Sequence, residues 1–436
     1  MVRADGSVVG TGLTDESGAF DAEYFAQEGA SYRVRAISAG AIDGFRVEVR
    51  DRTGASALYA VESELFEASE ATGGIDLLAA ADDGIGGGLN IVDSTIDAFQ
   101  FVAEYSDERS PTLTYFWQSG QSYSCGSCYS GNSIRLGGQL EDPDEYDDDI
   151  ILHEFGHYMV EHYSADSSGG GSHRDRLVDP YLAYGEGLAY FLSSAIRNDP
   201  TMTDNFLGDA RFIDYEAVTL AGEDLDDFYG TTNDGQDGNQ REELPAGIIW
   251  DVWDGPSPEE PWDTIELGGR TIELIFEYFH DGMPVDVGVR GIEITDFMNA
   301  VACELDVPSD LQPIIDDREY PFEAEEEASC SFKGTGTTIS VRAEQGDLIA
   351  SGDLAGLLFE VSLDDGGVLR KHTVSCATDE CVLASEADAT TLMVAIAAGK
   401  DGPVATSWVG RDALLRMLGG RLTTVDGYAV RSYPSR

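Results

Sequence analysis

Basic residues are scarce in this sequence. Of its 436 residues, 26 are Lys or Arg and only three of those are Lys, whereas 82 are Asp or Glu, which gives a formal net charge of −56 at pH 7. A chain with this excess of negative charge repels phosphate backbones and anionic lipid headgroups. Nucleic acid and anionic membrane surfaces are therefore excluded as expected partners, and the composition carries no prediction of oligomeric state.

Long hydrophobic runs are also missing. No stretch approaches the ~18 consecutive apolar residues that a membrane-spanning helix needs, so we expect no transmembrane segment. The first residues, Met1–Gly6, lack the apolar core of a secretory signal peptide. Because other features below favour secretion, we expect a truncated start and a mature protein that is extracellular or attached to the cell surface.

Histidine is rare as well, with six in the chain, yet two of the six stand four residues apart in His153-Glu154-Phe155-Gly156-His157. Residues four apart on a helix leave the same face about one turn apart. Two imidazoles in this arrangement can bind one Zn²⁺, with Glu154 beside them as a general base. The scarcity of histidine disfavours the alternative, a surface helix that carries two unused histidines.

A zinc site of this kind needs a third protein ligand. A metzincin would have Gly at position 160 and His at position 163, but this chain has Val160 and Tyr163, and His162 is one residue out of register. We predict instead that Glu186, at the start of a second helical pattern, is the third ligand. Two histidines and a glutamate would leave the fourth coordination position open for water, as catalytic zinc requires.

The motif pair His153-Glu154-x-x-His157 and Gly185-Glu186-Gly187 resembles that of the gluzincin metallopeptidases, nearest their fungalysin and thermolysin-like members. Leu244–Asp251 is similar to a helix that follows the active site in fungalysin-like proteins. The resemblance covers about residues 88–300. It implies a zincin-like α+β catalytic domain that binds Zn²⁺ in a helical site and hydrolyses protein or peptide substrates.

Two features depart from the family pattern. In thermolysin-like enzymes an acid four residues after the ligand glutamate supports a zinc histidine, and here that position holds Tyr190. The family's transition-state histidine has no counterpart by motif. Because a phenol can donate to a developing oxyanion, Tyr184 and Tyr158 are candidates for its role, and His280 is a third candidate.

The six cysteines form an even set, for which fifteen pairings are possible. Cys125-Gly-Ser-Cys128 could be a redox motif, but it lies in a Ser/Gly/Tyr-rich loop and does not begin a helix. Structural disulfides in an oxidising compartment are the simpler interpretation. Proximity along the chain suggests the pairs Cys125–Cys128, Cys376–Cys381 and Cys303–Cys330.

Residues 141–149 hold seven acids immediately before the expected zinc helix. Acids at a helix N-terminus complement the helix dipole, which is the favoured interpretation. A Ca²⁺ site is an alternative, because hard cations bind carboxylate oxygens. Steering of cationic substrates is compatible with both.

The remaining patterns predict three parts: a β-sandwich module over 1–70, a zinc metallopeptidase domain over 71–326 and a β-rich module over 327–436. The pattern from Thr14 to Phe20 is similar to the regulatory-like sandwich found beside carboxypeptidases, and we expect two strands around a turn over Val8–Phe20. Within the central part, helices are expected at 89–105, 179–198, 247–254 and 271–280, and strands at 111–117 and 133–136.

The sequence therefore predicts a secreted zinc metallopeptidase in which Glu154 activates water. Endopeptidase action is favoured because no motif marks a pocket for a free amine. Two alternatives stay open. One is a non-catalytic zinc-binding surface or adhesion protein on a peptidase scaffold, and the other is a redox protein that uses Cys125 and Cys128.

Overall fold

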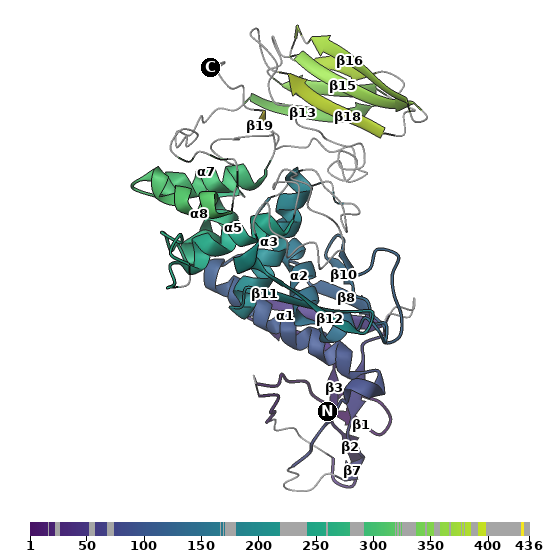
Figure 1. The fold of residues 1–436 in the computed structure, drawn as a ribbon. Helices are drawn as coiled ribbons and strands as arrows, with labels where there is room; N and C mark the ends of the chain where they lie inside the picture. Colours follow the sequence, from purple (N-terminus) through teal and green to yellow (C-terminus); the bar gives the residue numbers. More distant parts are fainter. Residues whose placement is uncertain are drawn as a thin grey trace. The chain divides into compact units, whose positions relative to one another are not determined.

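The computed structural model describes a mixed α/β protein with several sheets (Figure 1). The chain forms two compact units, Met1–His162 with Ala189–Asp214 and Tyr163–Leu188 with Tyr215–Arg436. The described residues are 1–15, 17–21, 27–51, 57–67, 74–165, 167–168, 170, 180–218, 242–258, 260–279, 292–318, 320, 322, 324, 337–344, 347–352, 358–365, 368–375, 377–378, 380–384, 391–397 and 429–430.

A five-stranded sheet is the core of the first unit. Its order is β4 (Ala39–Ile42), β5 (Phe45–Asp51), β8 (Leu113–Trp117), β10 (Ser133–Arg135) and β9 (Cys128–Tyr129). The central pairs β5–β8 and β8–β10 are parallel, and the outer pairs are antiparallel. Alternate residues of β5 and β8 are fully buried, as the period-two pattern of these segments predicts.

Helix α1 (Gly86–Tyr105) lies between β5 and β8 in the chain, so it makes the crossover that parallel strands require. Phe99 of α1 stacks on Phe45 of β5, with ring centroids 4.8 Å apart, and meets Phe155 edge-on at 5.2 Å. Phe155 belongs to α2 (Asp148–Tyr163). One aromatic cluster therefore fixes the helix that carries the histidine motif against both α1 and the sheet.

The C-terminal half of α3 (Pro180–Arg197) packs against α2 within the same unit. A Cβ on Gly156 would lie 2.8 Å from the Cα of Ala189, so glycine at this point lets the two backbones approach closely. Asp149, in the first turn of α2, forms an ion pair with Arg197 of α3. Its other oxygen accepts from the Thr203 N–H of the hairpin formed by β11 (Thr201–Phe206) and β12 (Asp209–Asp214).

The helices of the second unit surround one buried ion pair. Arg318 is fully buried, and its guanidinium donates to both carboxylate oxygens of Asp251 and to the carbonyls of Tyr215 and Val218. Asp251 belongs to α5, which packs against α6 and α8. The described helical elements that follow β12 are a 3-10 turn (Tyr215–Ala217), α5 (Glu243–Asp254), α6 (Gly269–Glu273), a π-helical turn (Leu274–Tyr278), α7 (Ile294–Glu304), a second 3-10 turn (Pro308–Leu311) and α8 (Gln312–Asp317).

The chain ends contribute further antiparallel sheets. Near the N-terminus, β1 (Val2–Arg3), β2 (Ser31–Arg33) and β7 (Phe66–Glu67) form one sheet, and β3 (Arg35–Ile37) pairs with β6 (Ala60–Glu62). The C-terminal strands form two sheets, in the orders β17-β14-β13-β19 and β16-β15-β18. Their bounds are β13 (Thr337–Glu344), β14 (Asp347–Gly352), β15 (Leu358–Asp365), β16 (Val368–Ser375), β17 (Glu380–Ala384), β18 (Thr391–Ala397) and β19 (Ala429–Val430).

One local prediction was wrong. Over Val8–Phe20 the described residues form the turn at Asp15 but no strand, and Val8 makes only an isolated bridge with Val2. The Asp15 carboxylate accepts from the Ser17 and Ala19 N–H groups, so side-chain hydrogen bonds satisfy this segment locally.

Strand pairing also joins segments on either side of residue 70. Strands β4 and β5 precede that residue, yet they belong to the sheet that contains β8 and β10. Alternating hydrophobicity locates a strand but does not identify its partner, so the three-part division of the chain stays a prediction. Among the described residues, no helix is both long enough and apolar enough to cross a bilayer.

Candidate metal centre

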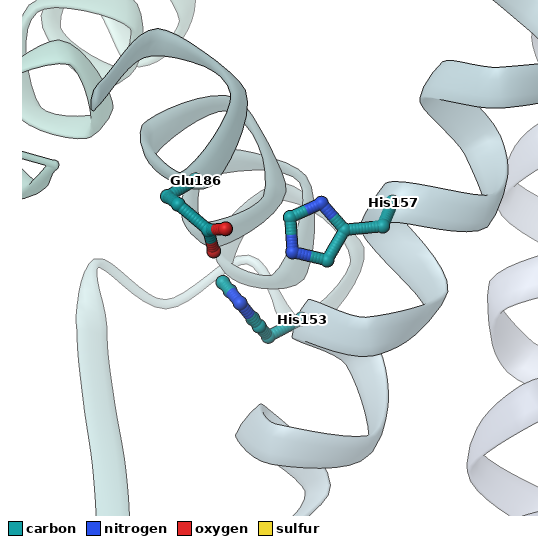
Figure 2. A group of neighbouring side chains, drawn as sticks. All are labelled: His153, His157 and Glu186. Carbon is teal, nitrogen blue, oxygen red and sulfur yellow. The ribbon is translucent and has the colours of Figure 1, made fainter. Parts of the chain in front are cut away.

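Helices α2 and α3 bring three potential metal ligands together. His153 and His157 leave α2 one turn apart, and Glu186 comes from α3. One ligand atom from each residue lies within 4.8 Å of the other two, and Figure 2 shows the Glu186 carboxylate facing the imidazoles. His153 and Glu186 are buried, whereas His157 is half-buried. The structure thus gathers the three residues that the sequence predicted as a ligand set.

The position of Glu186 follows from the packing of α3. Glu186 lies less than one helical turn before Ala189, the residue that touches Gly156 of α2. Because α3 is a continuous helix, the contact between Gly156 and Ala189 directs the Glu186 side chain toward the preceding turn of α2. Glu186 is far from the two histidines in the sequence, and the crossing of α3 over α2 brings it to them. Gly156 permits this close crossing because it has no side chain.

Tyr190 occupies the position at which thermolysin-like enzymes have an acid. It lies one turn after Glu186 on the same face of α3, and its ring packs on the ring of His153 with centroids 4.1 Å apart and planes tilted by 37°. Tyr190 itself is 7% exposed. An aromatic contact thus restricts the orientation of the His153 imidazole at this position.

Glu154 is buried on α2 directly beside His153. Its charge is one of the influences that raise the pKa of the Tyr115 hydroxyl, of which burial is the largest. Tyr115 belongs to β8, so the charge of Glu154 acts on a residue of the central sheet. The Glu154 carboxylate is therefore sheltered from bulk water, and it follows the candidate ligand His153 directly in the chain.

Two of the three candidate oxyanion partners, Tyr158 and Tyr184, lie in the described part of the chain. The Tyr158 hydroxyl donates to the carbonyl of Pro111 at 2.5 Å, which commits its only proton to the backbone. Tyr184 stands two residues before Glu186, so the two side chains leave α3 on nearly opposite faces. His280 lies outside the described residues. The oxyanion role of Tyr158, Tyr184 and His280 stays a prediction.

The cysteines of the described part are all in disulfides. Cys125 is bonded to Cys128, as proximity predicted. Cys303 and Cys381 are also disulfide-bonded, and their partners lie outside the described residues, as do Cys330 and Cys376. The pairings of these four cysteines stay predictions.

The acidic segment 141–149 divides into groups with different contacts. Asp148 and Asp149 stand in the first turn of α2, where acids complement the helix dipole. Asp142 and Asp144 instead approach Asp204, with oxygens of the three within 4.8 Å of one another. Burial raises the pKa of Asp144 to about 7, with the charges of Asp142 and Asp204 adding to it, while a hydrogen bond from Ser127 opposes the shift.

Sequence reasoning missed a third group of acids. Glu216, Asp254 and Glu260 also offer oxygens within 4.8 Å of one another. They come from three separate segments, and neither their spacing nor a motif marked them in a chain that is rich in acids throughout.

Comparison with known proteins assigns no family to the chain. No family model matches, and no curated protein matches. A solved structure, Legionella pneumophila aminopeptidase A in complex with aspartic acid, matches with a TM-score of 0.29 and 11% sequence identity. The match covers 84% of this chain and 37% of that one. A TM-score this low carries no argument about fold or function, and the chain spans well under half the length of that protein.

Proposed function

We propose that this chain is a zinc-dependent metallopeptidase with His153, His157 and Glu186 as the zinc ligands. The observation that carries the proposal is the convergence of their ligand atoms within 4.8 Å. Two imidazoles and one carboxylate form a donor set that catalytic zinc sites use, and the set leaves a coordination position for water. The donor chemistry and the burial of His153 and Glu186 both suit a resident Zn²⁺.

The chain's own residues supply the proton transfers and the orientation. When bound, Zn²⁺ would polarise the substrate carbonyl and make water a stronger nucleophile at neutral pH. Glu154 accepts the proton of the attacking water and passes it to the nitrogen of the leaving amine. Tyr190, through its ring contact, keeps the imidazole of His153 in one orientation.

The substrates on this proposal are proteins or peptides, cleaved internally and outside the cell. Internal cleavage is favoured because no motif marks a pocket for a free amine. Secretion is supported by the disulfide state of the described cysteines, since disulfides persist in oxidising compartments.

The test combines metal analysis with proteolysis on the full chain. We expect one zinc per chain in the wild type and in Glu154→Gln, and loss of zinc in His157→Ala and Glu186→Ala. Casein cleavage should be sensitive to chelators in the wild type, and Glu154→Gln should lower kcat by about 10²–10⁴-fold, because it removes only the general base. Zinc retained without Glu186 would show that the third ligand is assigned wrongly.

One observation favours a second function, that of a non-catalytic zinc-binding surface protein. Tyr190 stands where the resembling peptidases have a carboxylate, so the scaffold could keep the metal without keeping the reaction. Normal zinc content together with no cleavage of casein or of a mixed peptide pool would favour this alternative.

A further inference from the structure

Carboxylates from three segments of the second unit meet at one point. Glu216 lies in the 3-10 turn after β12, Asp254 is the last residue of α5, and Glu260 follows in the next loop. Each offers an oxygen within 4.8 Å of the others. Two oxygens that bind one Ca²⁺ at about 2.4 Å are at most about 4.8 Å apart. The spacing of the group is therefore that of ligands around a single large cation.

A fourth carboxylate, that of Asp263, is buried beside this group. Asp263 is 2% exposed, and neither of its carboxylate oxygens has a hydrogen-bond partner in the protein. Its N–H donates to the Glu260 carbonyl at 3.1 Å, so the two residues share a turn. Burial raises the pKa of Asp263 to about 8, and the charges of Asp251, Asp254 and Glu260 add to the shift. An ionised carboxylate is strongly unfavourable in such a position, so Asp263 either keeps its proton or is accompanied by a cation.

The nearby guanidinium does not neutralise the cluster. Arg318 donates to both oxygens of Asp251, and its remaining bonds go to the backbone carbonyls of Tyr215, Glu216 and Val218. Arg318 and Asp251 thus compensate each other. The carboxylates of Glu216, Asp254 and Glu260 therefore converge without a bound guanidinium, and Asp263 lies beside them in the turn that it shares with Glu260.

Neighbouring donors hold two of these carboxylates in place. The Trp250 indole N–H donates to Oε1 of Glu216 at 2.7 Å, and the Ser257 hydroxyl donates to Oε2 of Glu260 at 3.0 Å. Hydrogen bonds of this kind orient ligands around metal ions.

We propose that Glu216, Asp254, Glu260 and Asp263 bind a Ca²⁺ ion. An oxygen-only donor set selects a hard cation, and four carboxylates suit Ca²⁺ better than Mg²⁺, which uses one or two carboxylates and keeps several waters. The site uses none of the residues assigned to zinc, so it holds whether or not the chain is a peptidase.

The test measures Ca²⁺ binding to the full chain by calorimetry in a zinc-containing buffer, with Mg²⁺ titrated separately. Thermal unfolding and Tb³⁺ luminescence, sensitised by Trp250, are followed in parallel. The variants are Asp254→Asn and Glu216→Gln, which keep side-chain shape and remove one charge. The matched control is Asp142→Asn, which removes one charge from the other acidic group.

We expect saturable Ca²⁺ binding to the wild type, a Ca²⁺-dependent rise in Tm, and weaker binding of Mg²⁺. Loss of an outer hydrogen-bonding partner weakens metal sites about 10–100-fold, so loss of a ligand should weaken Ca²⁺ at least about tenfold in both cluster variants. The control should bind like the wild type, and zinc content should be equal in all four proteins. Absence of saturable binding to the wild type, or binding that Asp142→Asn removes and the cluster variants keep, would overturn the proposal.

Discussion

At the scale of single residues, Tyr190 makes the least expected contact of the candidate metal centre. The centroid of its ring lies 4.1 Å from that of His153. From the sequence, position 190 was notable only because it lacks the expected acid. We predict that Tyr190→Ala weakens Zn²⁺ binding by about 10–100-fold, because the imidazole loses the contact that orients it. Competition with a chromophoric chelator measures the Kd.

Tyr190→Phe is the matched control for this prediction. It keeps the ring and removes the hydroxyl, so zinc affinity should stay near that of the wild type. If Tyr190→Ala bound Zn²⁺ as tightly as Tyr190→Phe, the ring contact would not be the orienting interaction.

Asp144 gives a prediction about pH. Its folded-state pKa is raised to about 7, mainly by burial, whereas an unfolded Asp titrates near 3.9. Between about pH 4 and 7 the folded state therefore binds more protons than the unfolded state, and stability falls as pH rises. Asp144→Asn removes this penalty, so in calcium-free buffer it should stabilise the protein by on the order of 1–3 kcal/mol at pH 8 and by little at pH 4.5.

Urea unfolding of both proteins at the two pH values measures the difference. Comparing the variant with the wild type cancels the other titrating groups, which both proteins share. An equal effect of the substitution at pH 4.5 and pH 8 would contradict the assignment.

At the scale of secondary-structure elements, the packing of α3 against α2 determines where Glu186 lies. Asp149 of α2 forms an ion pair with Arg197 at the C-terminal end of α3. The Asp149 side chain is 4% exposed and the Arg197 side chain is 27% exposed. We predict that Arg197→Met destabilises the protein by about 1–3 kcal/mol, because it leaves a buried carboxylate without its cation. Urea unfolding measures the loss.

The double variant Asp149→Asn, Arg197→Met separates loss of the pair from loss of packing. With the carboxylate neutralised, the double variant should be more stable than Arg197→Met alone. If the double variant lost as much stability as Asp149→Asn and Arg197→Met lose in sum, the ion pair would not couple the two positions.

Element positions were largely predictable because periodicity is local. The helices expected at 89–105, 179–198 and 247–254, and the strands expected at 111–117 and 133–136, all appear with shifts of a few residues at their ends. The strands expected within Val8–Phe20 do not appear, because Asp15 satisfies its neighbours through side-chain hydrogen bonds. Helix α7 was missed, although Glu293 and Asp296 form a capping box at its start.

The candidate centre could be proposed from sequence because three of its four assigned residues, His153, Glu154 and His157, lie within about one turn of a single helix. Glu186 needed only one further helix. The proposed calcium ligands could not be found this way, because no motif marks them and tertiary packing brings Glu216 to the others. They are Glu216, Asp254, Glu260 and Asp263. The same reason hides the contact between Tyr190 and His153.

At the scale of the whole molecule, the net charge of −56 dominates. Self-repulsion disfavours the compact state, and salt shortens the screening length from about 30 Å at 0.01 M to about 3 Å at 1 M. We predict that raising NaCl across this range increases Tm by several degrees at pH 8. Scanning calorimetry in calcium-free buffer measures the shift.

Acidification supplies the control for the salt effect. At pH 4.3, close to the sequence pI of about 4.1, a large share of the carboxyls is protonated and the net charge is small, so the same salt increase should raise Tm less. A Tm that is independent of salt at pH 8 would mean that repulsion is compensated locally in the folded state.

The close contact between Gly156 and Ala189 limits the substitutions that homologous sequences can carry at these two positions. A Cβ on Gly156 would lie 2.8 Å from the Cα and 3.1 Å from the Cβ of Ala189, so a larger residue at position 156 would clash with α3. A larger residue at position 189 would in turn crowd the backbone of α2. Position 156 falls inside the histidine motif, and position 189 falls between Glu186 and Tyr190. Homologous sequences should therefore keep small residues at both positions together, and this paired restriction offers a search pattern for distant relatives.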